Sequence, residues 1–354
     1  MKIGFVLQYR RHDVVYAAMR LADFFRRSGH EVSVFSLGSA RKVPRLSTDW
    51  DHLVVPEHAL PYTTWLQDVH AVVFPVPVGA PTVAAANRAG CKTVSMAAWD
   101  WLPLQPGEGF RISDTVVAPY RQAADLVRDQ FQLDNVVHVP WDCGLPLTRK
   151  ANEDLAGDRA NVLFPIHCTQ GGRTWPEVVA ALAAKVVELC PWVDATLSMT
   201  PKTLQASSLT AVRRVTAYPP KGGTLTVLED PTGWTHTPLV YGRHDLTVWA
   251  AELEGYGMTG LESLCMGTPV VAYDVSPMSE LVKDGENGRL VPCDLRWAPD
   301  RVPVVKPDWS AMQETVINLL NNRTGIADLR RNTRLNLMAR REKFAAGWAT
   351  ILGT

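Results

Sequence analysis

Short apolar segments alternate with longer amphipathic ones along the first part of the chain. Runs of four to six mostly apolar residues predict buried strands at 3–7, 31–35, 71–76, 92–96, 114–118 and 135–139. Between them, apolar residues recur every three or four positions, which predicts helices at about 13–28, 81–89 and 120–131. Strands that alternate with helices pair in parallel and are covered on both faces. The pattern therefore predicts an α/β domain.

A stretch rich in glycine, proline and charge interrupts this alternation at 142–160, and the alternation then begins again. Further strands are predicted at 161–166, 194–199, 224–228, 245–250 and 268–273, with a helix at 175–190 and a mostly helical end at 308–350. We expect an N-terminal domain over 1–145, a linker over 146–160 and a C-terminal domain over 161–335. A last helix over 336–354 follows, for which packing back on the first domain is one arrangement. Two doubly wound domains that face each other would bind ligands in the cleft between them.

Composition narrows the class of protein. The 354 residues are 46% apolar and 20% charged, which excludes a disordered chain, and 36 basic residues balance 36 acidic ones. The balance excludes a protein that coats polyanions along its whole surface. Residues 1–48 nevertheless hold nine basic against three acidic residues, whereas 151–300 hold eleven against eighteen. The basic front is either an ordinary solvated surface or one that meets an anionic partner.

Cysteine spacing and hydropathy bear on metal binding and on the cellular location of the protein. No two of the six cysteines are closer than 22 residues, so zinc-ligand spacing is absent and we expect no metal. No apolar run reaches 18 residues, and the N-terminus lacks the pattern of a signal peptide. We expect a soluble protein of the cytoplasm. Peripheral attachment to the inner membrane face, through the segment 24–27 (FFRR), stays open.

The segment 254–272 (EGYGMTGLESLCMGTPVVA) is the strongest candidate for a binding site. It joins a predicted strand to the start of a helix. Glycines there allow a tight turn and a close approach of another molecule. Helix N-termini bind phosphate, and four residues occupy that start: Gly257, Met258, Thr259 and Gly260. The carboxylates of Glu254 and Glu262 suit sugar hydroxyls. The segment predicts a nucleotide-sugar pocket; the alternative is a structural turn with two solvated glutamates.

This segment resembles the glutamate–seven–glutamate element of family 4 glycosyltransferases. Segments 245–249 (DLTVW), 284–292 (DGENGRLVP) and 28–32 (SGHEV) are similar to other motifs of that family. The resemblance implies the GT-B fold, in which two Rossmann-like domains face a cleft, and metal-independent transfer with retention at the anomeric carbon. It implies that Glu254 binds the donor sugar, that Glu262 binds the ribose, and that the four helix-start residues bind the diphosphate. The co-substrate would be a UDP or GDP sugar, without a further cofactor.

Three loops hold further candidate residues, and in the first two the chain departs from the family. The family's arginine and lysine after the first strand of the second domain are here reduced to Arg173, which we expect to neutralise the leaving phosphate. In place of a glycine pair after the first strand stands a bulky basic loop, which makes Tyr9, Arg10 and Arg11 candidates for acceptor binding and His12 a candidate acid or base. A third loop is expected to face the cleft, with Asp100 orienting an acceptor hydroxyl between the stacking rings of Trp99 and Trp101.

The sequence therefore predicts a retaining glycosyltransferase that moves a sugar from a nucleotide-diphosphate sugar to a hydroxyl of a glycan or lipid-linked sugar. A second interpretation is a phage-type DNA glycosyltransferase, in which the basic front tracks phosphates and a tryptophan stacks on a flipped base. A sugar-nucleotide epimerase and a non-catalytic sugar-binding protein are further alternatives. The oligomeric state is left open.

Overall fold

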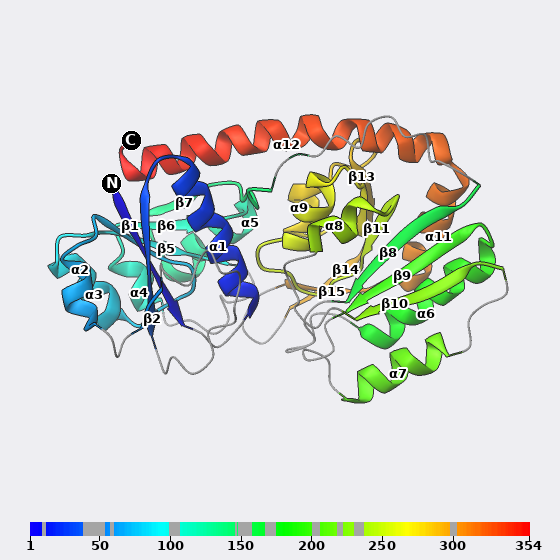
Figure 1. Ribbon diagram of the computed structural model, residues 1–354, viewed down its shortest axis with the longest axis horizontal. Coiled ribbons are helices and arrows are strands. Elements are labelled where there is room, and N and C mark those ends of the chain that lie inside the picture. Colours follow the sequence, from blue (N-terminus) through cyan, green and yellow to red (C-terminus); the bar gives the residue numbers. More distant parts are fainter. Residues whose placement is uncertain are drawn as a thin grey trace. The chain divides into compact units, whose positions relative to one another are not determined.

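The computed structural model describes residues 1–8, 12–37, 54–56, 60–98, 107–145, 147, 158–166, 175–199, 206–217, 222–229, 237–297 and 303–354 (Figure 1). Its contacts divide the chain into two compact units. The first unit consists of Met1–Gly144 and Arg340–Thr354, and the second of Leu145–Ala339. Each is described by itself.

The first unit is built on a parallel sheet with the strand order β3-β2-β1-β4-β5-β6-β7. Its strands are β1 (Lys2–Gln8), β2 (Glu31–Leu37), β3 (Val54–Pro56), β4 (Ala71–Phe74), β5 (Lys92–Met96), β6 (Thr115–Ala118) and β7 (Val136–His138). Its helices are α1 (His12–Arg27), α2 (Tyr62–Leu66), α3 (Ala80–Arg88), α4 (Glu108–Arg111) and α5 (Arg121–Phe131). All six strands predicted in this part are present. The short elements β3, α2 and α4 were not predicted, because three to five residues are too few to show a period.

The C-terminal end of the last helix, α12 (Arg323–Leu352), completes the core of this unit. The ring of Trp348 meets Phe25 edge-on at 5.1 Å between centroids, and the ring of Phe344 meets Phe24 at 4.7 Å. Phe25 is only 1% exposed. The two rings of the segment 24–27 thus pack against α12, whereas its arginines, Arg26 and Arg27, are exposed.

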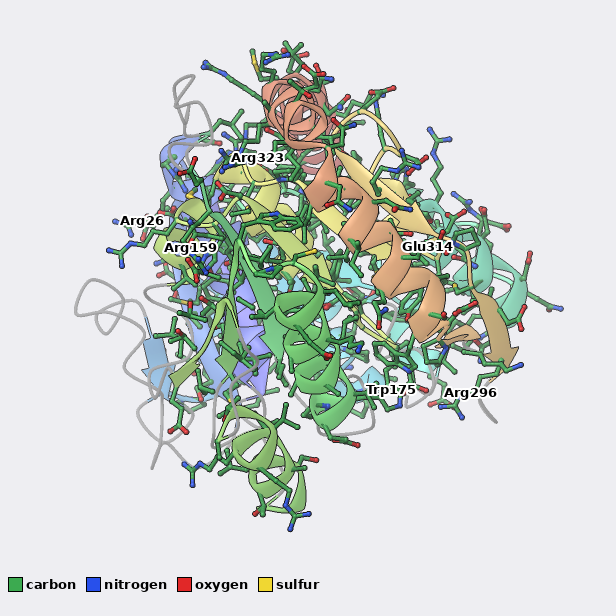
Figure 2. All side chains as sticks on the ribbon, turned by 90° about the vertical axis from the view of Figure 1, so that its right-hand side faces the viewer. Arg26, Arg159, Trp175, Arg296, Glu314 and Arg323 are labelled. Atoms are coloured by element: carbon green, nitrogen blue, oxygen red, sulfur yellow. The ribbon has the colours of Figure 1, made fainter. Side chains whose placement is uncertain are left out.

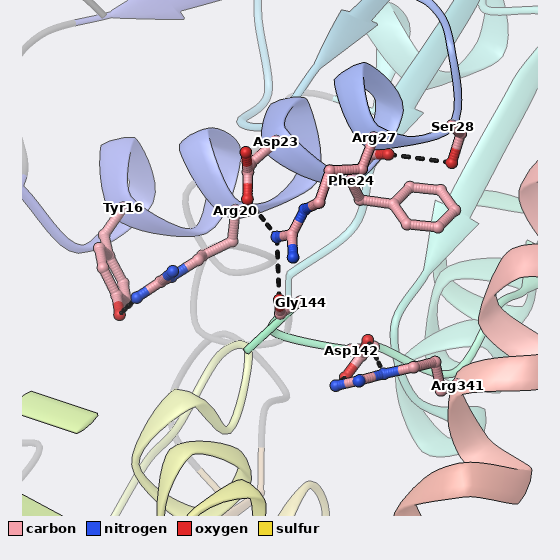
Figure 3. A network of polar contacts seen from close by, with 9 residues as sticks. All are labelled: Tyr16, Arg20, Asp23, Phe24, Arg27, Ser28, Asp142, Gly144 and Arg341. Atoms are coloured by element: carbon pink, nitrogen blue, oxygen red, sulfur yellow. Dashed lines mark hydrogen bonds and ion pairs between the residues drawn. The ribbon is translucent and has the colours of Figure 1, made fainter. Parts of the chain in front are cut away.

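Two arginines hold the segment that follows β7 (Figure 3). Arg341 on α12 donates two hydrogen bonds to the buried carboxylate of Asp142, from Nε to Oδ2 at 2.9 Å and from a second nitrogen to Oδ1 at 3.3 Å. Arg27 at the end of α1 pairs with Asp23 and donates to the carbonyl of Gly144 at 2.9 Å. These bonds fix the last residues of Met1–Gly144 to both helices.

The second unit contains a parallel sheet with the order β10-β9-β8-β11-β12-β13 and an antiparallel hairpin, β14-β15. Its strands are β8 (Ala160–Ile166), β9 (Val193–Met199), β10 (Thr224–Glu229), β11 (Leu246–Trp249), β12 (Val270–Tyr273), β13 (Gly288–Val291), β14 (Asp294–Trp297) and β15 (Pro303–Lys306). Its helices besides α12 are α6 (Pro176–Leu189), α7 (Ala206–Thr216), α8 (Thr237–Gly242), α9 (Met258–Cys265), α10 (Met278–Leu281) and α11 (Trp309–Asn321). The five predicted strands are present; β13, β14 and β15 were missed.

The start of α12 is anchored in this unit by a chain of polar contacts. Arg159, just before β8, binds the carboxylate of Asp194 through two nitrogens at 2.6 and 2.7 Å. This pairing lowers the pKa of Asp194 to about 2. Arg323, at the first position of α12, donates to the carbonyl of Arg159 at 3.2 Å; both arginines are labelled in Figure 2.

In the described part of the chain no helix is both long and apolar enough to cross a membrane.

The strand order locates the crevice of each sheet. In the second unit the chain runs outward from β8 through β9 to β10 and then returns to β11, on the other side of β8. The strand order therefore reverses between β8 and β11, and ligands of doubly wound sheets bind in the crevice outside the carboxyl ends of the strands at such a switch point. The first unit has the same arrangement at β1 and β4.

Candidate functional site

The glycine-rich loop lies at the crevice of the second unit. It connects the end of β11 at Trp249 to the start of α9 at Met258. Glu254 stands on this loop, half-buried, and its Oε1 accepts a hydrogen bond from the backbone N–H of Gly255 at 3.1 Å. The loop thus carries the first of the two predicted carboxylates to the carboxyl edge of the sheet.

Gly257 makes the turn from the loop into the helix possible. It caps α9 with φ 65° and ψ 28°, a left-handed conformation that costs residues with a side chain about 1–2 kcal/mol. The first bond of the helix runs from the N–H of Leu261 to the carbonyl of Gly257 at 3.0 Å. The N–H groups of the residues between them point out of the helix N-terminus. Such a terminus attracts an anion.

Gly260 has a second role that the sequence did not indicate. A Cβ at this position would lie 2.4 Å from the ring of Trp249, the last residue of β11. Only glycine therefore lets α9 approach the strand this closely. Trp249 is itself 3% exposed and has no room to move outward.

We expect Gly260→Ala to lower the free energy of unfolding by about 1–3 kcal/mol, because the new methyl group overpacks the Trp249 ring. Urea unfolding would measure the change. Gly242→Ala is the matched control, since a Cβ on this last residue of α8 finds Met266 at an ordinary 3.7 Å. Equal stability of the two variants would contradict the role given to Gly260.

Glu262 lies inside the protein rather than at an open surface. All eight residues of α9 are buried and Glu262 is 1% exposed, so the alternative of a solvated glutamate is wrong for this residue. The segment after α9 is tied to α8, since the hydroxyl of Thr268 donates to the carbonyl of Tyr241 on α8 at 2.8 Å. Neighbouring Ser263 donates to Thr247 on β11 at 2.8 Å.

Tyr241 is a polar residue of this site that the sequence did not reveal. Its ring is buried, and burial together with the carboxylates of Glu262 and Glu254 raises the pKa of its phenol well above the usual range; a side-chain hydrogen bond with Thr259 acts in the opposite direction. Tyr241 therefore stays protonated. No spacing rule connects it with the glutamates, and its only signal is a lone aromatic residue on a short helix before a strand.

Two charged side chains hold the loop and its strand in place. Glu252, buried at the start of the loop, pairs with Arg296 on β14 (labelled in Figure 2), and its carbonyl accepts the N–H of Val305 on β15 at 3.1 Å. Asp245, just before β11, accepts the N–H of Asn161 at 2.8 Å and pairs with Arg330 at 2.7 Å. The hairpin thereby supports the start of the loop, and the first half of α12 supports the start of β11.

The segment 284–292, which resembles a family motif in sequence, has a structural role. Asn287, which is fully buried, accepts the N–H of Lys283 at 2.8 Å and donates to the carbonyl of Leu281 at 3.2 Å. Asp284 accepts the N–H of Leu290 at 2.8 Å. These side chains shape the turn that leads from α10 into β13.

The structure thus brings one group of predicted residues together on the β11–α9 connection: Glu254, Gly257, Met258, Thr259, Gly260 and Glu262. The other candidates lie outside the described residues: Tyr9, Arg10, Arg11, Trp99, Asp100, Trp101 and Arg173. The backbone of His12 begins α1, but its side chain is likewise outside the description. Their roles stay predictions.

Comparison with known proteins identifies a related segment. Residues 231–299 match the family model of glycosyl transferases group 1, which covers the loop and α9. The lipopolysaccharide core biosynthesis mannosyltransferase LpsB of Rhizobium meliloti (strain 1021) is 44% identical over 62 residues. That match spans 17% of this chain and 18% of the length of LpsB.

Solved structures resemble the whole chain. Anabaena HepE, in complex with UDP and glucose, superposes with a TM-score of 0.70 at 14% identity and covers 100% of both chains. Sucrose-phosphate synthase of Thermosynechococcus elongatus has a TM-score of 0.70 at 13% identity, over 99% of this chain and 98% of the other. The predicted α/β fold with two Rossmann-like domains is confirmed. This chain has the GT-B fold, and its best-described site lies in a segment similar to glycosyl transferases group 1.

Proposed function

We propose that the protein is a retaining glycosyltransferase that moves a sugar from a nucleotide-diphosphate sugar to a hydroxyl group of a glycan or lipid-linked sugar. The observation that carries the proposal is the arrangement of Glu254 and Glu262 around the N-terminus of α9, at the crevice of the second unit. Carboxylates bind sugar hydroxyls, whereas a helix N-terminus binds phosphate, so the site offers a partner for each part of such a donor.

Catalysis at this site would be mainly positioning and charge stabilisation. The amides at the start of α9 would face the diphosphate, whose negative charge grows as the bond to the sugar breaks. Arg173 is proposed to supply a cation for the same charge. Glu254, on the loop, would orient the sugar through its hydroxyls, and a phosphate oxygen would accept the proton of the acceptor hydroxyl. The reaction so described has no step that requires a metal.

The related proteins narrow the choice of substrates to be tested. HepE was solved with UDP and glucose, which makes UDP sugars the first donors to try. LpsB is named for mannose transfer in lipopolysaccharide core biosynthesis, which supports a lipid-linked glycan as the acceptor.

A donor screen tests the proposal. We expect the protein to release nucleotide from one UDP or GDP sugar, faster with a glycan or lipid-linked acceptor, with unchanged rate in EDTA and with the anomeric configuration retained in the product by NMR. Release of nucleotide from no donor, with any acceptor including hydroxymethylated DNA, would contradict the transferase activity. Inversion would contradict the mechanism alone, and loss of activity in EDTA its metal independence.

A further inference from the structure

The hairpin β14–β15 contacts the loop between β11 and α9 through both of its strands. On β15, the N–H of Val305 donates to the carbonyl of Glu252 at 3.1 Å. On β14, the guanidinium of Arg296 pairs with the carboxylate of the same glutamate. The two strands are joined in an antiparallel ladder in which Arg296 lies opposite Val304, the neighbour of Val305. The backbone and the side chain of one loop residue are therefore held by one element.

Burial of Glu252 makes the pairing with Arg296 necessary. The side chain of Glu252 is 6% exposed, whereas that of Arg296 is 62% exposed. A buried carboxylate needs a cation or several hydrogen-bond donors, because an uncompensated charge in the interior is costly. The arginine supplies the positive charge from the surface, while its backbone stays in the ladder of the hairpin. Without the arginine the carboxylate would be stabilised by reaching water, which requires the loop to move.

Such a movement would be passed on to Glu254. Only Leu253 separates the two glutamates, and two residues of chain span at most about 7 Å. Transfer requires the sugar to be held close to its reacting geometry, and misplacement by about 1 Å can cost about 100-fold in rate. The N-terminus of α9 begins only at Gly257, beyond this part of the loop. The effect should therefore fall on the sugar and not on the nucleotide.

We propose that Arg296 and Glu252 are a positioning pair, which holds the loop before α9 so that Glu254 meets the sugar of the donor in the productive orientation. The inference rests on the proposed function and deepens it, because both residues act through Glu254 and neither touches the reacting atoms. It gives a task in catalysis to the hairpin β14–β15, which lies outside the glycine-rich segment 254–272.

The variant Arg296→Met tests this role, because it removes the charge and keeps much of the side chain. We expect kcat at saturating donor to fall about ten- to hundredfold. The Kd for UDP or GDP, whichever binds the wild-type protein, should stay within threefold by calorimetry, which also shows that the second unit is folded. Arg296→Lys keeps a cation at this position and should restore most of the turnover.

A double variant separates positioning from a general loss of structure. Glu252→Gln removes the buried negative charge that the arginine compensates. Added to Arg296→Met, it should raise kcat above that of Arg296→Met alone, since no uncompensated charge is then left to draw the loop outward. A general loss of structure would instead become larger with the second substitution.

Lys306→Met is the control in the same hairpin. Lys306 pairs with Asp294 at 3.3 Å, and the side chains of both residues are largely exposed. Loss of such a surface pair should leave turnover and nucleotide affinity as in the wild-type protein.

The outcomes separate this inference from the function on which it rests. Wild-type turnover by Arg296→Met, an equal loss in Lys306→Met, or a still lower turnover in the double variant would overturn the role of the pair alone. A parallel loss of nucleotide binding in Arg296→Met would do the same, because the pair would then support the whole site. Release of nucleotide from no donor by the wild-type protein would overturn the proposed function, and the inference with it.

Discussion

Glu254→Gln is expected to lower kcat about 100- to 1000-fold while the Kd for the nucleotide stays within threefold of the wild-type value. The carboxylate stands on the loop between β11 and α9, outside the helix whose amides would bind the diphosphate. Replacement by an amide preserves the shape of the side chain but removes its negative charge. That charge would orient the sugar and stabilise the positive charge that develops at the reacting carbon of the sugar. Binding of the nucleotide, in contrast, depends on α9 and Glu262.

Two measurements check this expectation: turnover at saturating donor and nucleotide affinity by calorimetry. Glu286→Gln is the matched control, since Glu286 lies exposed in the turn before β13, where it pairs weakly with Lys283 at 3.7 Å and accepts a hydrogen bond from Asn336 at 3.3 Å. We expect it to act as the wild-type protein. Wild-type turnover by Glu254→Gln would remove the central role given to this residue, and a parallel loss of nucleotide binding would move that role from catalysis to binding.

Trp348→Ala is expected to lower the free energy of unfolding of the first unit by about 3–5 kcal/mol, the usual effect of truncating a large buried aromatic residue. Trp348 is 1% exposed and packs edge-on against Phe25 and Phe344. The cavity would open where α12 meets α1, far along the sequence from the strands of that unit. The core of the first unit is therefore complete only when the end of α12 has packed against it.

Urea unfolding followed by circular dichroism would measure the loss of stability. Leu335→Ala is the control on the same helix, because Leu335 is 68% exposed and its truncation should change stability by less than about 0.5 kcal/mol. If Trp348→Ala unfolded at the same urea concentration as Leu335→Ala, the end of α12 would not be part of the core of the first unit.

Much of the fold follows from local pattern. Strands buried on both faces of a parallel sheet are continuous apolar runs, and β5 lies at 92–96, the residues where the pattern predicts it. Elements without such a run escaped prediction. Strand β13, at the edge of its sheet, carries an exposed arginine, Arg289, and β14 has the exposed charged residues Asp294 and Arg296, so neither strand is a continuous apolar run.

The candidate site divides in the same way. Glycines and glutamates at fixed spacing are a local signal, because the turn and the first turns of α9 are built from consecutive residues. The sequence alone therefore determined the β11–α9 connection, its two carboxylates and the doubly wound class of the fold. The tertiary structure decided what surrounds them: the burial of Glu262, the contact of Gly260 with Trp249, the tyrosine of α8 beneath α9, and the packing of α12 on Phe24 and Phe25. Each of these depends on contacts between residues from different elements, which a periodic pattern along the chain does not encode.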